Sequence, residues 1–341
     1  MTPAVRGLML SPLGKYLTLA GLLALICFAG TVHGAGSPGL ERVLITHSSE
    51  SISIAPLQYG MERGFYRKEG LDLQFRILRG DLGIAAMVGS KEVDYISGAG
   101  TAFAAAVKGF PVSVLAHDFK SVFFYLMAQP NVSGGKELKG GKIAVSSLGG
   151  TGAVATRATL RAIGLNPDRD VTVIVIGSAS VRMAAMEAGS IQAAVMPVPW
   201  NFRMRKKGFN ELIYAGNVMS QPLTGIATSR EKLERNPDQV RKMLRGFLAT
   251  LNAVKREKKE VTNFIERKYS IEPDVAEEVY GVMVQALTED GTVPESALQD
   301  LLEQTKAEVG VKKDIASSSI VDYRLLKEAA KHFRRQGESV P

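Results

Sequence analysis

The sequence predicts an α/β protein of two lobes with mixed, mostly parallel sheets. From Glu41 to about Thr228, short apolar segments that suit strands alternate with helical patterns, and glycine or proline marks most of the changes. A second block repeats the plan of the first, and the remainder of the chain is nearly all helical in pattern. About 305 residues follow the N-terminal segment described next, which is enough for two lobes with separate cores.

The first 35 residues have the layout of a secretory signal peptide. Arg6 and Lys15 come first, the apolar run 17–30 follows, small residues close the segment, and no acidic residue interrupts it. A membrane anchor is the alternative, but the run is shorter than the roughly 20 apolar residues that span a bilayer. Lipid attachment at Cys27 is disfavoured because isoleucine precedes it, where a small residue is usual. We therefore expect cleavage near residue 35 and a periplasmic protein.

Residue usage excludes several chemistries. Cys27 is the only cysteine, so the mature chain has no disulfide, no thiolate nucleophile and no cysteine metal site. His47, His117 and His332 are far apart in sequence, with no pair at a metal-ligand spacing. No nucleophile elbow and no phosphate-binding loop with its lysine are present. We expect neither a cofactor nor a metal.

The charge pattern favours a small anion over nucleic acid as the partner. The formal charge of +8 falls to +6 once Arg6 and Lys15 are removed, and no recognition motif for nucleic acid is present. The basic clusters 203–207 and 255–259 are interpreted as solvated helix faces or ends.

The first lobe is expected over 36–128, and its elements follow in order. Gly64 and Gly70 stand where the chain must reverse, and Gly109 ends a helix. Strands are predicted at 43–46, 71–77, 93–97, 112–116 and, as the crossing between lobes, 123–128, with helices at 56–63, 84–88 and 101–108.

The second lobe is expected over 129–222 and repeats this plan. The polar segment 134–141 leads into it, and Gly164 closes its first helix. Residues 85–96 also resemble 184–195, which indicates two lobes of one design. Strands are predicted at 143–146, 171–176 and 193–196, with helices at 150–163 and 180–188.

The last segment, 223–341, is expected to complete the first lobe. A return crossing at 223–228 precedes apolar residues at spacings of three and four, and Asn236-Pro-Asp238 and Pro294 suit helix starts. Helices are predicted at 238–258, 261–267, 273–287, 295–309 and 321–333, packed on the first lobe.

Residues 55–73, APLQYGMERGFYRKEGLDL, resemble a segment of nitrate/taurine/sulfonate-type solute-binding proteins of ABC importers. Val93-Asp94, the turn 108–111, and the segments 138–145 and 186–193 follow in the family order. The resemblance implies a periplasmic-binding-protein fold with two hinge crossings and a monomer that hands its ligand to an ABC permease in the inner membrane. Two residues depart from the pattern: Lys91 replaces the usual glycine, and Gln192 replaces the usual second aspartate.

Ligands of open α/β sheets bind beyond the carboxyl ends of strands, where loops lead into helices. The loop 146–152 is the strongest candidate, because its small residues let backbone N–H groups and hydroxyls approach an anion at a helix start; helix capping by Ser147 or Thr151 is the alternative. The four loops give these predicted ligand-binding residues: His47, Ser48, Ser49, Gly98, Ala99, Gly100, Thr101, Ser146, Ser147, Gly149, Gly150, Thr151, Gly152, Pro197, Pro199 and Trp200.

For the other three loops the structural alternatives stay open. A Gly-Ala-Gly turn at 98–100 also serves simply to reverse the chain, Trp200 suits either a cleft wall or the packing of the second lobe, and His47 suits a satisfied polar position at a strand end. The sequence thus predicts a receptor that closes around a small anion such as a sulfonate, nitrate or a carboxylate, although a pyrimidine would also suit loops rich in glycine and hydroxyl groups. A sensory receptor and an enzyme resembling the pyrimidine synthases of thiamine synthesis are the alternatives.

Overall fold

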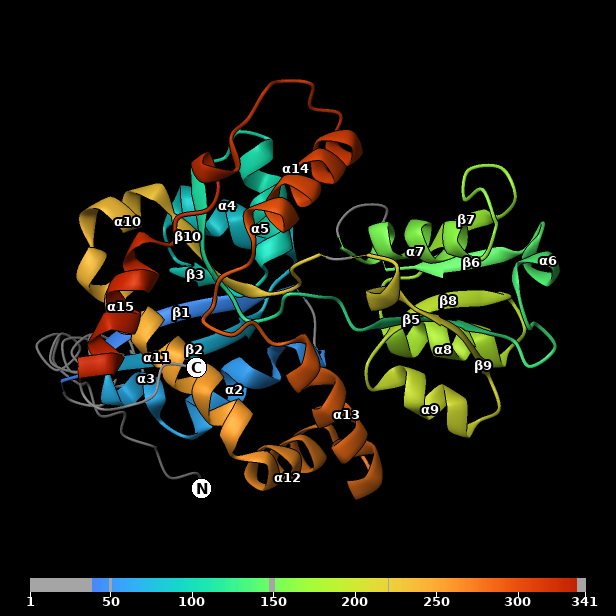
Figure 1. Cartoon of the computed structure of the whole chain (residues 1–341), viewed down its shortest axis with the longest axis horizontal. Coiled ribbons are helices and arrows are strands. Elements are labelled where there is room, and N and C mark those ends of the chain that lie inside the picture. The colour runs from blue at the N-terminus through green and yellow to red at the C-terminus, as the bar shows by residue number, and fades with distance from the viewer. Residues whose placement is uncertain (1–38, 49–50, 147–150, 220, 336–341) are drawn as a thin grey trace, which may run out of the picture. The chain divides into compact units, whose positions relative to one another are not determined.

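The computed structural model describes residues 39–48, 51–146, 151–219 and 221–335, so the predicted signal peptide lies outside it. Within Leu40–Pro341 the described chain forms two five-stranded mixed sheets with helices around each (Figure 1). The prediction of a two-lobed α/β protein is therefore confirmed. No helix among the described residues has the length and apolar character needed to cross a bilayer.

The first sheet has the order β2-β1-β3-β10-β4, and the second has the order β7-β6-β8-β5-β9. In each sheet the first three strands are parallel and the last two are antiparallel to their neighbours. The two lobes therefore share one plan, as the internal resemblance predicts. The strands are β1 (Glu41–His47), β2 (Leu71–Ile77), β3 (Tyr95–Ile96), β4 (Val112–His117), β5 (Phe124–Ala128), β6 (Lys142–Val145), β7 (Thr172–Val175), β8 (Ala193–Pro197), β9 (Asn210–Tyr214) and β10 (Gly225–Ser229).

The structure shows how Gln192 and Lys91, which depart from the pattern described above, are accommodated. Asp94 Oδ2 accepts from the backbone N–H of Leu44 at 2.7 Å in the first lobe, and Gln192 Oε1 accepts from that of Lys142 at 2.7 Å in the second. The amide thus makes the bond that the carboxylate makes, so the departure leaves the fold intact. Lys91 has φ of 61°, a left-handed conformation that favours glycine, and its side chain pairs with Glu231.

The chain up to Asn217 supplies the helices that accompany the strands. In the first lobe a left-handed Gly64 separates two of these helices and a left-handed Gly70 precedes β2, in agreement with the predicted reversals. The elements are η1 (Ile52–Ile54), α2 (Ala55–Glu62), α3 (Phe65–Lys68), α4 (Gly80–Ala85), η2 (Ala86–Ser90) and α5 (Ala99–Val107) in the first lobe, and α6 (Gly135–Leu138), α7 (Thr151–Ala162), α8 (Ala179–Glu187), α9 (Trp200–Lys206) and η3 (Ala215–Asn217) in the second.

The C-terminal helices pack on the first lobe, as predicted. Asn236 caps the longest of them by accepting from the backbone N–H of Gln239, with Pro237 in the first turn. This helix, α11, buries its apolar face against α2, α3 and α15. The helices are α10 (Arg230–Arg235), α11 (Pro237–Arg256), α12 (Lys258–Tyr269), α13 (Pro273–Ala286), α14 (Glu295–Val309), η4 (Ser317–Ser319) and α15 (Arg324–Arg335).

Two segments connect the sheets, and hydrogen bonds join them. Asp118 donates its backbone N–H to the carbonyl of Thr224 at 3.2 Å, and Leu223 donates to the carbonyl of Phe119 at 3.3 Å. The first segment follows β4 of the first sheet and leads to β5, which pairs within the second sheet. The second segment leads back to β10 of the first sheet. The chain therefore changes sheets before residue 128, the boundary expected from the sequence.

Candidate ligand-binding site

The four predicted ligand loops follow β1, β3, β6 and β8 in the structure. In each sheet the two strands concerned run parallel to their neighbour, so their carboxyl ends lie at the same edge.

In the first lobe a hydrogen bond joins the ends of β1 and β3. His47 Nδ1 lies 2.8 Å from Ser97 Oγ, and both side chains are buried. Burial lowers the pKa of His47 to about 4, so its imidazole is neutral at physiological pH. The predicted residue Ser48 is exposed, and Ser49 lies outside the described residues. His47 thus offers a polar group without a charge.

The segment predicted as a loop at 98–101 is largely helical. Gly98 is the N-cap of α5, and Ala99, Gly100 and Thr101 form its first turn, whose N–H groups have no acceptor within the helix. Close packing fixes this turn, because a Cβ at Gly80 of α4 would lie 2.7 Å from Thr101 Cγ2. The start of α5 therefore packs closely against α4 at the edge of the first sheet.

In the second lobe the end of β6 meets the start of α7. Ser146 is exposed, and a Cβ at Gly152 would lie 2.8 Å from its Oγ. A side chain at position 152 would therefore force the Ser146 hydroxyl to move. Ser147, Gly149 and Gly150, the centre of the predicted loop, lie outside the described residues.

The two helix starts meet between the lobes. A Cβ at Gly100 of α5 would lie 3.1 Å from Thr151 Oγ1 of α7 and 4.0 Å from the carbonyl oxygen of Leu223 on the return crossing. The structure therefore brings together residues of the second and third predicted loops, which are far apart in sequence.

The fourth loop turns at a cis Val198–Pro199 bond, and Trp200 then begins α9, after Pro197 at the end of β8. The Trp200 indole is half-buried beneath the Arg203 guanidinium, which lies 5.0 Å from the ring centre. Arg203 donates to the carbonyl of Tyr269, and Tyr269 Oη donates to the carbonyl of Ser51 beyond β1 at 3.1 Å. Trp200 is thus connected to Ser51, which follows the first predicted loop.

Sequence reasoning missed Ser51, Ser97, Arg203 and Tyr269. Ser97 had a signal, because it directly precedes Gly98 at the end of a predicted strand. Arg203 and Tyr269 had none, since 66 positions separate them and only the fold makes them neighbours.

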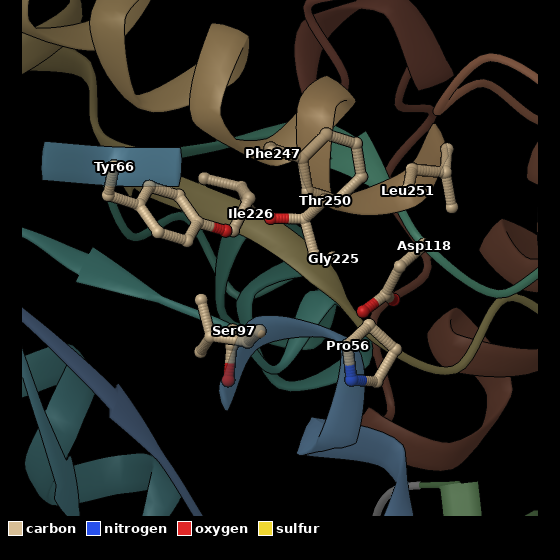
Figure 2. A pocket seen from close by; sticks show the side chains of 10 residues that line it. Pro56, Tyr66, Ser97, Asp118, Gly225, Ile226, Phe247, Thr250 and Leu251 are labelled. Carbon is tan, nitrogen blue, oxygen red and sulfur yellow. The ribbon is translucent and has the colours of Figure 1, made fainter. Parts of the chain in front are cut away.

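A small cavity lies inside the first lobe, beside the end of β3 and the start of the second predicted loop. Residues of α2, α3, α11, β10, the β3–α5 connection and the crossing segment line it, among them Tyr66, Ser97, Asp118 and Thr250 (Figure 2). Its volume is about 10 Å³, room for about one water molecule. Asp118 is buried here and accepts from Thr224 Oγ1, and burial raises its pKa to about 7. The described residues contain no group of three side chains suited to hold a metal ion.

Two matching sheets joined by two crossing segments define a two-lobed periplasmic-binding-protein fold. Sequence comparison assigns the family: this chain belongs to the NMT1-like family, whose model matches residues 51–265. The riboflavin-binding protein RibY of Chloroflexus aurantiacus is 28% identical over 223 residues, which cover 63% of this chain and 62% of that protein. The chain thus matches less than two thirds of that relative's length.

Solved structures share the fold at low identity. The alkanesulfonate-binding protein SsuA of Xanthomonas axonopodis pv. citri, bound to MOPS, has a TM-score of 0.66 at 15% identity, covering 84% of this chain and 99% of that one. The periplasmic nitrate-binding protein NrtA of Synechocystis PCC 6803 has a TM-score of 0.68 at 15% identity, covering 90% and 92%. The desulfurization enzyme DszB has a TM-score of 0.63 at 14% identity, covering 86% and 100%.

Proposed function

We propose that this protein is a periplasmic solute-binding receptor that closes its two lobes around a small anion and delivers it to an ABC importer. The observation that carries the proposal is the approach of Gly100 to Thr151, at which the first turn of α5 faces the first turn of α7. The first N–H groups of a helix have no acceptor within that helix, and two such helix starts, supplied by different lobes, suit an anion held between them.

The electrostatics at these helix starts fit the same ligand class. His47 stays neutral and can donate or accept according to its tautomer, and Ser146 and Thr151 add hydroxyl groups. Exclusion of water when lobes close strengthens each of these interactions with an anion. No covalent step is needed, so binding is reversible.

The ligand class we propose is a sulfonate, nitrate or a carboxylate. The support is the shared fold with proteins that bind an alkanesulfonate and nitrate. Riboflavin is the rival ligand, because the RibY match is the more similar in sequence.

The first test is a thermal-shift screen of the mature chain from residue 36. Taurine, an alkanesulfonate, nitrate, a dicarboxylate, riboflavin and a pyrimidine form the panel. A ligand that binds only the folded state raises Tm by mass action, by an amount that grows with its concentration. We expect one anion to do so selectively. A shift with riboflavin or the pyrimidine alone would contradict the anion assignment.

The second test adds a side chain between the helix starts. Gly100→Val places a branched group where a Cβ alone already lies 3.1 Å from Thr151 Oγ1, so affinity for the ligand found in the screen should fall at least tenfold. Ala104→Val, one turn further along α5 and half-buried, is the matched control and should bind normally. Equal affinities of the two variants would exclude this position as part of the site.

An enzymatic function is the second candidate, because DszB shares the fold. The described chain contains no cysteine, since Cys27 precedes it. Biphenyl-2-sulfinic acid is the compound to test, because a structure of a DszB variant contains it. Incubation with this compound, with release of its sulfur followed over time, should show binding at most. Turnover would replace the receptor proposal by an enzymatic one.

A further inference from the structure

The basic cluster on α9 contacts the first lobe although its helix belongs to the second. α9 packs on α8, β5, β8 and β9, while its partners lie at the end of α12, just before α13 and within α13. α12 packs on α2 and α11 of the first lobe, and α13 packs on α12. The contacts are Arg203 Nη2 to the Tyr269 carbonyl at 3.0 Å, Arg205 Nη2 to Glu278 Oε2 at 2.7 Å, and Lys206 Nζ to Glu272 Oε2 at 3.2 Å and Asp274 Oδ2 at 3.7 Å.

Arg203 occupies a special place in this set. Its guanidinium lies 5.0 Å from the Trp200 ring centre and donates to the last carbonyl of α12, with the Ser270 carbonyl at 3.5 Å. A helix carboxyl end attracts a cation, and so does an indole face. Arg203 is therefore held between a residue of the predicted site and a helix of the other lobe.

The far end of this contact reaches Ser51, just after the first predicted loop. Tyr269 Oη donates to the carbonyl of Ser51 at 3.1 Å and contacts Gln58 Oε1 at 3.2 Å. Trp200 beyond β8 and Ser51 beyond β1 are thereby linked through two side chains, one from each lobe.

We infer that α9 is an electrostatic latch between the lobes and that Arg203 is a positioning residue, which sets the Trp200 indole at the ligand site when the latch is engaged. The inference rests on the proposed function, in which the lobes close over a ligand. The ion pairs of Arg205 and Lys206 are about half exposed, and such a pair changes an equilibrium by about fivefold at most. The latch is therefore weak enough to open, and it weakens with salt.

The chain provides its own reporter, because Trp200 is the only tryptophan. Indole emission of the ligand-free protein, excited selectively over tyrosine, should change as salt is raised from about 0.05 to about 1 M. Arg203→Gln should show an altered emission at low salt and little further change with salt, and Arg203→Lys should recover part of the wild-type signal. Glu278→Gln, which alters only the first lobe, should make the emission respond at lower salt.

The matched control is Arg157→Gln. Arg157 pairs with Asp168 at 2.6 Å with similar exposure, but both residues lie in the second lobe. This variant should keep the wild-type emission and salt response. An Arg203→Gln protein that emits like the wild type at every salt concentration, or an Arg157→Gln protein that behaves like Glu278→Gln, would overturn the latch.

A distance measurement separates the latch from the ligand proposal. Cysteines replacing the exposed Lys108 on the first lobe and Lys139 on the second can be labelled specifically, because the mature chain has no other cysteine. Without ligand, Arg205→Gln and Glu278→Gln should each raise the population with widely separated labels up to about fivefold at low salt. Failure of every ligand in the thermal screen would leave this result standing, whereas unchanged label distances would sink the latch alone.

Discussion

Asp118 should make the folded protein less stable as the pH rises from about 4 to about 7. Its carboxyl group is buried on the first crossing segment, and burial raises its pKa from 3.8 to about 7. The groups that oppose this increase are the Thr224 hydroxyl and the backbone N–H groups of Asp118 and Phe119, none of which carries a charge. The folded state therefore keeps the proton through a pH range in which the unfolded chain releases it.

The sign and size follow from proton linkage. Between the two pKa values the folded state binds more protons than the unfolded state, so the free energy of unfolding falls by about 1.4 kcal/mol per pH unit. The stabilisation is fully present below about pH 4 and is lost by about pH 7, and the ionised carboxylate then costs about 4 kcal/mol.

Two buried histidines act in the opposite direction over an overlapping range. Burial lowers the pKa of His47 to about 4 and that of His117 to about 3, from 6.5. Their unfolded forms bind the additional proton below about pH 6.5, so these residues make stability rise with pH there. The wild-type pH profile alone therefore does not isolate Asp118.

Comparison with Asp118→Asn does isolate it. The amide cannot ionise, and its oxygen can still accept from Thr224 Oγ1. Urea unfolding of both proteins at about pH 5 and about pH 8 should show the variant gaining about 3 kcal/mol relative to the wild type between these values. A difference that stays constant with pH would refute a raised pKa at this position.

Three further substitutions test the packing. Gly225→Ala should lower the free energy of unfolding by about 2–3 kcal/mol in urea, because its Cβ would lie 1.9 Å from the Ala116 carbonyl oxygen on the neighbouring strand. Gly281→Ala, with no atom near its Cβ inside α13, should instead raise it by up to about 1 kcal/mol, and a loss would contradict the packing described. Arg182→Met removes the donor that binds two carbonyls of the β7–α8 connection. The free energy of unfolding should fall by about 1–3 kcal/mol, with a lower Tm as the readout. An unchanged Tm would mean that solvent replaces the lost donor.

Most strands and helices of the fold were predictable from local patterns. The predicted strand 71–77 and helix 295–309 agree with β2 and α14 to the residue, because apolar periodicity and glycine or proline mark their ends. β9 was missed, because this edge strand pairs only with β5 and none of its residues is fully buried, so it lacks the apolar alternation that identifies a strand. The helix of 101–108 begins earlier than predicted, because Ala99 and Gly100 form its first turn.

The site was predictable only in part, for a physical reason. The rule that ligands bind beyond the carboxyl ends of strands selects loops one at a time, and it selected Gly100 and Thr151 without indicating that they approach each other. The basic cluster on α9 has the composition of a solvated helix face, and Arg205 and Lys206 are indeed half exposed.

What distinguishes this cluster from an ordinary surface is the identity of the partners, which no local pattern contains. Lys207 pairs with Glu187 within its own lobe, whereas Arg205 pairs with Glu278 of the other lobe. A pair within one lobe keeps the same energy when the lobes separate, but a pair between lobes is lost. Only a pair between lobes favours closure. Arg205 and Lys207 have similar charge and exposure, so salt should weaken both ion pairs alike. Only the weakening of the Arg205 pair should change the equilibrium between open and closed lobes.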